Sequence, residues 1–365
     1  MKSTGPDSEI NNEKLEGISP AEDATWGDYP IDTLLIRNEM RTVYDIVRRI
    51  EKGSFIMNPD FQREFIWPRD KQSKLIESVI MRIPLPVFYL AEDDEGRMIV
   101  VDGLQRLSTF RDFLDNKLTL DLKDRKELHG KKFEKLSPKL QNRVEDCNLV
   151  LYVIDAKVPD RARLDIFERV NGGMTLTRQQ MRNCLYNGKA TRFLKKEATS
   201  KLFLKATGGS LRASTMRDRE FVNRFCAFRI NPESEYRGDM DDFLAKALKK
   251  MNKMTEEELE RLSSTFRNSL RNNYMAFNKH AFRKHTSSSQ SRSVINASLW
   301  DVMTNGLCEY SEGIIEANIR NLQSGFYQLM EDEGFIASVT YGVNDMKRVR
   351  TRFKRSREVF GEIFG

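Results

Sequence analysis

The stretch VDGLQRLST, residues 101–109, places several chemically active side chains at one strand-to-helix turn. An apolar strand pattern ends in Asp102 and Gly103, and the next turn carries Gln105 and Arg106. Glycine lets a backbone approach a ligand closely, and the free N–H groups at the start of a helix attract anions. An arginine in the first turn adds a planar fork that binds phosphate. These residue types indicate a phosphate site in which Asp102 holds a water or a magnesium ion.

The position of Arg106 on the predicted helix leaves a second interpretation open. At 100° per residue, Arg106 lies within the apolar arc that contains Leu107 and Phe110 and that must face the core. An unpaired buried charge costs several kcal/mol, so Arg106 needs an anionic partner. That partner is either a bound phosphate or a carboxylate of the chain, Asp102 or Glu77. In the second case Asp102 also caps the helix.

The elements around this turn alternate between helix and strand. The segments YDIVRRIEKG and RDKQSKLIESVIMR have helical spacing, and the first is stopped by Gly53. PVFYLAE and RMIVVD predict a hairpin whose DDEG turn gives Gly96 a positive φ. LQRLSTFRDFLDN predicts a helix and NLVLYVID a strand. Up to about residue 157 the chain therefore has the pattern of an α/β or α+β domain.

From RARLDIFERVNGG onward the pattern is almost entirely helical, with a capping box at Thr177 and Gln180. A chain of 365 residues is long enough for two domains. We expect a flexible acidic tail over 1–30, an α/β domain over 31–160 and a helical domain over 161–365.

Charge is distributed unevenly along the chain. Residues 1–30 hold two lysines and seven acidic residues, which gives this segment a net charge of −5. Since the whole chain carries +7, the remaining residues carry a net charge of +12. A basic body suits a polyanion such as DNA, although solubility alone also explains it. The clearest basic stripe lies on the C-terminal helix and consists of Lys347, Arg348, Arg350, Arg352, Lys354, Arg355 and Arg357. It predicts salt-dependent contacts to a phosphate backbone, and the alternative is an exposed helix whose apolar side packs down.

Three blocks of the sequence resemble a known family. VVDGLQRLSTF is similar to the DGQQR motif of the ParB/sulfiredoxin-like domain in GmrSD-type modification-dependent restriction enzymes and SspE-like defence proteins. NPDFQREFIWPRDKQSKLIESVIMRIPLPVFYL resembles the opening block of that domain, and IFERVNGGMTLTRQQMRNCLY resembles its closing block. The blocks occur in the family's order and cover about residues 31–190.

The resemblance implies a ParB/sulfiredoxin-like mixed-sheet domain followed by a mainly helical domain. It also implies binding of a nucleoside triphosphate with Mg²⁺, hydrolysis of that nucleotide and a setting in bacterial anti-phage defence. Residue by residue, it assigns catalysis to Asp102, Gln105 and Arg106, and nucleotide binding to Gln62, Arg63, Gly103 and Asn171. Leu104 stands where the family has its first glutamine, which places hydrolysis in doubt. Without the resemblance, Arg63 reads as a surface ion-pair partner and Asn171 as a helix-ending corner.

Other chemistry is disfavoured by the sequence. The four cysteines lie far apart, which argues against zinc or disulfides and suits reduced thiols in a cytoplasm. No apolar stretch approaches the ~20 residues that span a bilayer, so no membrane contact is expected. We expect no metal centre and no HNH nuclease site, because His129, His280 and His285 read as surface residues.

The sequence thus predicts a nucleotide-binding protein that controls DNA recognition or restriction, with DNA, a separate nuclease subunit or a second copy as partners. One alternative is a catalytically inactive DNA-binding or regulatory module, which Leu104 favours. Another is a metal-dependent nuclease that uses Glu145 and Asp146 before a strand and Asp155 and Lys157 after it.

Overall fold

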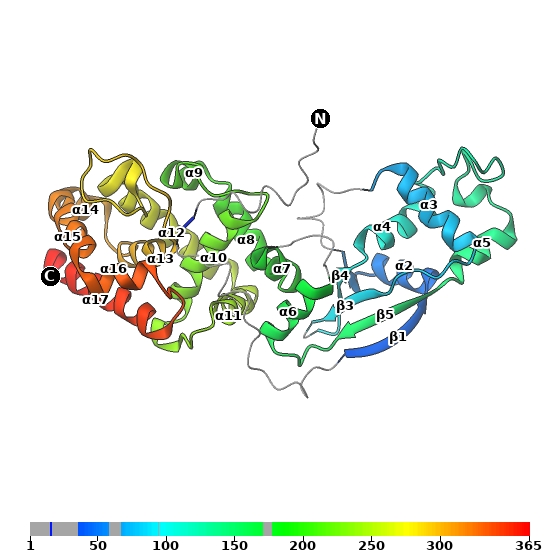
Figure 1. Ribbon diagram of the computed structural model, residues 1–365, viewed down its shortest axis with the longest axis horizontal. Helices are drawn as coiled ribbons and strands as arrows, with labels where there is room; N and C mark the ends of the chain where they lie inside the picture. Colours follow the sequence, from blue (N-terminus) through cyan, green and yellow to red (C-terminus); the bar gives the residue numbers. More distant parts are fainter. Residues whose placement is uncertain (1–14, 17–35, 58–66, 94, 171–176) are drawn as a thin grey trace. The chain divides into compact units, whose positions relative to one another are not determined.

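The computed structural model describes residues 15–16, 36–57, 67–93, 95–170 and 177–365 (Figure 1). The chain divides between Leu176 and Thr177 into two compact units. The sequence pattern suggested a boundary after residue 160, so the observed boundary lies further along the chain. The helix that follows residue 160 packs with the sheet unit, since Ala162, Leu164 and Phe167 are buried in it.

The sheet unit contains a mixed five-stranded sheet with the order β1-β5-β3-β4-β2. Strand β1 pairs antiparallel with β5, β5 parallel with β3, β3 antiparallel with β4, and β4 parallel with β2. The elements of this unit are β1 (Ile36–Thr42), α2 (Val43–Glu51), β2 (Phe55–Ile56), α3 (Arg69–Ile80), β3 (Phe88–Glu92), β4 (Met98–Asp102), α4 (Leu104–Leu114), η2 (Phe133–Lys135), α5 (Pro138–Glu145), β5 (Asn148–Ile154) and α6 (Asp160–Val170).

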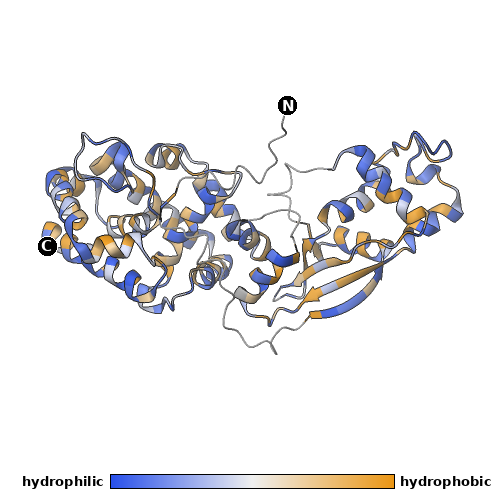
Figure 2. Cartoon of the chain, viewed as in Figure 1, coloured by the Kyte–Doolittle hydropathy of each residue, from blue (hydrophilic) through white to orange (hydrophobic). Residues whose placement is uncertain are grey.

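Most of the elements predicted from periodicity are confirmed. The hairpin β3–β4 turns at Gly96, whose φ is +75°, and α2 ends before Gly53, whose φ is +73°. Leu90 pairs with Val100 on one side and with Val153 on the other, and all three are buried. The core of this unit lies between these strands and the helices α2, α3, α4 and α5. Figure 2 shows hydrophobic residues concentrated in the inner strands such as β5 and β3, and alternating with hydrophilic residues along the helices.

The second unit is helical, as the sequence predicted. Its elements are α7 (Arg178–Leu185), α8 (Lys189–Ala198), α9 (Lys201–Thr207), α10 (Arg217–Ile230), η3 (Glu233–Glu235), α11 (Met240–Lys253), α12 (Glu256–Phe277), η4 (Asn278–His280), α13 (Ala297–Gly306), α14 (Glu312–Ala317), α15 (Ile319–Glu331), α16 (Glu333–Thr340) and α17 (Met346–Phe364). The capping box of Thr177 and Gln180 opens α7 as expected. Trp300 anchors the core of this unit: it is fully buried and donates through Nε1 to the carbonyl of Phe221 at 2.8 Å.

Only Leu15 and Glu16 of the expected acidic tail are among the described residues. Glu16 forms a parallel bridge with Asn296 and an ion pair with Lys284 within the helical unit. At this point the chain is therefore anchored rather than flexible.

A buried ion triad ties three helices of this unit together. Asp301 on α13 accepts two hydrogen bonds from Arg224 on α10, at 2.8 and 2.6 Å, and one from Arg352 on α17 at 3.0 Å. The side chains of Asp301 and Arg352 are fully buried. Removing one partner from a buried ion pair leaves the other charge without compensation.

We predict that Asp301→Asn lowers the free energy of unfolding by about 3–5 kcal/mol, because two buried guanidiniums then face a neutral amide. Urea unfolding of the full chain followed by far-UV circular dichroism measures this loss. Glu309→Gln is the matched control, since Glu309 forms an exposed ion pair with Arg229 that is worth at most about 1 kcal/mol. Equal, small losses in both variants would show that the triad does not hold the helices.

Candidate functional site

The turn between β4 and α4 has a geometry that only glycine fulfils. Gly103 has a φ of +100°, in the left-handed region that L side chains rarely adopt. A Cβ atom at this position would lie 2.3 Å from Cδ1 of Phe88. The chain therefore passes directly over the Phe88 ring before α4 begins at Leu104.

Arg106 uses its guanidinium to hold this turn together. Its Nη2 donates to Asp102 Oδ2 at 2.7 Å and to the carbonyl of Val87 at 3.0 Å, and its Nη1 donates to the carbonyl of Pro86. The guanidinium carbon lies 4.0 Å from the centroid of the Phe88 ring. Arg106 thus ties the chain entering β3 to the chain leaving β4.

Burial dominates the electrostatics of Arg106. The residue is 8% exposed, and burial lowers the pKa of its guanidinium while the Asp102 carboxylate opposes that shift. An arginine stays charged under these conditions, so it needs its carboxylate partner. Of the partners that the sequence left open, Asp102 occupies this role, and Glu77 instead pairs with Arg125 at 2.7 Å.

The remaining residues of the motif divide between core and surface. Leu104 is buried, while Gln105 is half-buried and its Oε1 accepts a hydrogen bond from the backbone N–H of Trp67 at 3.1 Å. Asp102 is the most accessible charged group of the turn, with 38% of its side chain exposed. It does not cap α4, which has no side-chain cap at all.

Three residues assigned to nucleotide binding lie outside the described residues. They are Gln62, Arg63 and Asn171. Trp67, next to the first of these segments, packs partly buried against the core, and Lys71 lies 4.4 Å over its ring.

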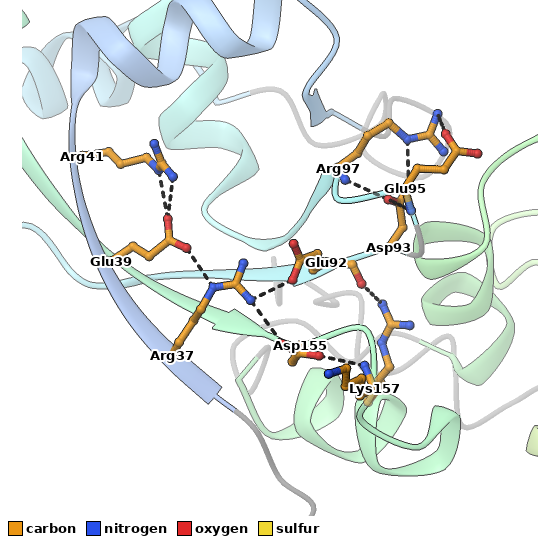
Figure 3. Close-up of polar contacts among 10 residues, drawn as sticks. Arg37, Glu39, Arg41, Glu92, Asp93, Glu95, Arg97, Asp155 and Lys157 are labelled. Carbon is orange, nitrogen blue, oxygen red and sulfur yellow. Dashed lines mark hydrogen bonds and ion pairs between the residues drawn. The ribbon is translucent and has the colours of Figure 1, made fainter.

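The alternative nuclease residues are not brought together. Glu145 and Asp146 precede β5 and Asp155 follows it, and a seven-residue strand separates its ends by about 20 Å. Asp155 accepts from the backbone N–H of Lys157 at 2.9 Å and from Arg37 at 3.4 Å (Figure 3). Within the described part of the chain, no group of three or more His, Cys, Asp or Glu side chains is placed to hold a metal ion.

The acidic side chains near Asp155 form ion pairs with arginines of β1. Arg37 also bonds Glu92 at 2.7 Å and Glu39 at 2.9 Å, and Arg41 bonds Glu39 (Figure 3). Arg41 also pairs with Asp45. Acidic groups paired in this way read as a structural network on the sheet rather than as a catalytic centre.

The prediction for the basic stripe on α17 is wrong at Arg352. This side chain is completely buried, and it bonds Asp301 and the carbonyl of Val343. It lies on the same side of the helix as the buried Val349 and Phe353, so it faces the core. Burial also lowers the pKa of its guanidinium.

The other basic residues of the stripe on α17 lie at the surface, but some of them are already paired with acidic side chains. Lys354 and Arg355 pair with Glu358, and Arg357 pairs with Glu233. Lys347, Arg348 and Arg350 form no ion pair within the described ranges. The charge available to a polyanion is therefore concentrated in the first turns of α17.

Two of the histidines expected at the surface are buried. His280 and His285 stack with ring centroids 4.8 Å apart, next to Phe277 and Phe326. Burial lowers the pKa of His285, so its neutral form is favoured. His129 is exposed as predicted.

The comparison with protein families agrees with this architecture. The model for the GmrSD restriction endonuclease, N-terminal domain, matches residues 43–187, from the start of α2 through α7. This part of the chain is similar to the GmrSD N-terminal domain family. A search of curated proteins and a search of solved structures each gave no significant match.

The GmrSD-type domain relates the chain to restriction and defence systems. Its matched range includes the whole Asp102–Arg106 turn and ends within the helical unit. Among the described helices, none is long and apolar enough to cross a membrane.

We predict that Gly103→Ala destabilises the protein by about 2–4 kcal/mol, because it adds a clash with Phe88 to the strain of a positive φ. Gly53→Ala is the matched control: Gly53 also has a positive φ but has no atom near the added Cβ, so it loses about 1–2 kcal/mol. Thermal unfolding of both variants measures the difference. Equal losses would mean that the chain does not pass close over the Phe88 ring.

Proposed function

We propose that this protein belongs to a defence system related to restriction endonucleases and binds a nucleoside triphosphate at the β4–α4 turn. The nucleotide state then controls how the protein engages DNA. The observation that carries the proposal is the Asp102–Gly103 turn, which opens α4 without a side-chain cap in a GmrSD-type domain.

The backbone supplies the phosphate contacts in this proposal. The first N–H groups of a helix have no partner within the helix, and the helix dipole places partial positive charge at the same end. Gly103 lets the chain turn into α4 at this point, because its missing Cβ leaves room for the Phe88 ring. Arg106 is a positioning residue here, since its guanidinium is bonded to Asp102 and to the carbonyls before β3.

Asp102 is the residue that would hold a magnesium ion. Its Oδ2 accepts a hydrogen bond from Arg106, while 38% of the side chain is exposed to solvent. Mg²⁺ commonly binds through one or two carboxylates, several waters and the phosphates of its nucleotide. A single carboxylate oxygen and the triphosphate together fit that pattern.

Leu104 argues that binding rather than rapid hydrolysis is the function of this turn. It replaces the first glutamine of DGQQR and is buried in the core, so the turn lacks one polar side chain toward a ligand. We therefore propose a nucleotide-gated switch with slow turnover.

The DNA contact is proposed for the first turns of α17. Lys347, Arg348 and Arg350 lie within four residues of one another and form no ion pair in the described part of the chain. Neutralising phosphates with lysine and arginine releases counterions, so this contact weakens steeply with salt. Arg352 has no part in it, because its side chain is buried.

We predict that the protein binds a nucleoside triphosphate with Mg²⁺ and that Asp102→Asn weakens this binding by about tenfold or more. The asparagine carbonyl still accepts from Arg106, so the turn stays formed. Isothermal titration calorimetry with each common triphosphate, with Mg²⁺ and with EDTA, measures the effect.

Asp112→Asn is the matched control, since Asp112 lies on the same helix but pairs with Arg111. It should bind nucleotide as the unsubstituted protein does. No binding of any triphosphate, or equal affinities of the two variants, would refute a nucleotide site at this turn.

A further inference from the structure

A cavity lies in the sheet unit, and its lining does not include the Asp102–Arg106 turn. It has a volume of about 540 Å³ and opens between the C-terminal end of α3 and the helix α5, which lie side by side (Figure 1). Its size falls within the range of about 300–1,000 Å³ that is typical of small-molecule sites. None of the five DGLQR residues lines it.

Arg82 enters this cavity from a strained backbone position. It follows α3 with a φ of +59°, and the amides of Arg82 and Ile83 donate back to Val79 and Ser78 at 2.9 Å. Helices that end in this way usually carry glycine at the left-handed position. Strain of this kind clusters at functional sites, so an arginine here points to a use for its side chain.

Arg143 and Lys139 supply two further cations from α5. Nη1 of Arg143 donates to the carbonyl of Ile80 at 3.2 Å, and its Nε is buried without a hydrogen-bond partner. A buried donor without a partner is costly, which indicates a missing acceptor. Lys139 lies one turn earlier on the same face of the helix, and within the described ranges neither Lys139 nor Arg82 has an ion pair.

The rest of the lining limits the kind of ligand. The cations outnumber the one lining carboxylate, that of Asp146, by three to one, so the cavity carries a formal charge of +2. Arginine and lysine together suit a phosphate, because arginine contacts two of its oxygens at once. Val79, Ile83 and Leu85 form an apolar wall for the body of the ligand. Asp146 needs a donor from the ligand, such as a sugar hydroxyl or an amino group.

We propose that the cavity between α3 and α5 binds a small phosphorylated molecule with a flat or apolar body, of the class of the nucleoside monophosphates. Arg82, Lys139 and Arg143 contact the phosphate, and the apolar wall covers the base. This site goes beyond the proposed triphosphate switch, because it uses other residues and needs no magnesium.

Cys147 provides a reporter that is specific to this cavity. It lines the cavity and is half-buried, whereas Cys184, Cys226 and Cys308 are buried. Burial raises the pKa of the Cys147 thiol, so alkylation is best followed at mildly alkaline pH. The full chain is treated with N-ethylmaleimide in EDTA, and the rate at Cys147 is read by mass spectrometry with increasing AMP, GMP, CMP or UMP.

We expect at least one monophosphate to slow the alkylation of Cys147 in a saturable manner. Arg82→Gly should weaken this protection by about tenfold while raising the melting temperature, because glycine adopts the left-handed conformation without strain. Lys139→Gln should weaken protection without raising the melting temperature. Lys74→Gln is the control: Lys74 is exposed on α3 and does not line the cavity, so protection should stay unchanged.

Arg82→Gly should weaken the protection of Cys147 while it raises the melting temperature. A loss of protection in this variant therefore reports a loss of binding and not a loss of stability. Absence of protection by every monophosphate would overturn the proposal, and so would protection by inorganic phosphate or duplex DNA alone. Unchanged protection in both Arg82→Gly and Lys139→Gln would also overturn it. Asp102→Asn should leave Cys147 protection intact, so failure at the β4–α4 turn and failure at this cavity give different results.

Discussion

The sheet unit depends on one buried guanidinium. Arg106 connects three parts of the chain: the carboxylate at the end of β4, the carbonyls before β3 and the first turn of α4. Its burial requires a negative partner, and Asp102 provides it within the same turn. Because Gly103 lies against the Phe88 ring, the positions of these groups are coupled. These contacts fix a corner of the sheet unit at which the accessible Asp102 carboxylate lies beside the uncapped start of α4.

Buried arginines recur in the helical unit with the same physical logic. Arg224 and Arg352 share the carboxylate of Asp301, and both guanidiniums lie in the core. A positive charge in the sequence is thus not always a charge at the surface. The count of 61 lysines and arginines overstates the positive charge available to a polyanion, since many of these side chains compensate buried or paired acidic groups.

Periodicity predicted most of the fold because local patterns determine local structure. The hairpin at Gly96, the helix from Leu104 and the capping box at Thr177 each follow from residues within a few positions. The interior position of Arg106 also followed from its angle on the helix. The same angular argument would have placed Arg352 beside Val349 and Phe353, but the density of basic residues suggested a fully exposed stripe.

Partners that depend on tertiary contacts could not be predicted in the same way. A helical angle says that Arg106 points inward, but it does not say whether a phosphate or Asp102 meets it. His280 at the end of η4 and His285 in the segment that follows stack on each other, and His285 packs against Phe277 and Phe326, so their burial depends on tertiary contacts. The cavity beside Arg82 depends on α3 and α5, which lie more than 50 residues apart in the chain and so share no local pattern.

The most direct measurement is hydrogen–deuterium exchange of the full chain with Arg106→Gln, Asp102→Asn and the double variant. The account predicts faster exchange in β3, β4 and the start of α4 for Arg106→Gln, with the helical unit unchanged as an internal reference. The double variant should exchange no faster than Arg106→Gln alone, because Asp102 acts on these strands through its contact with Arg106, which Arg106→Gln already removes. Exchange at the original rate in β3 and β4 of Arg106→Gln would contradict the account, since Arg106 would then be free to serve as a ligand group rather than as the anchor of this corner.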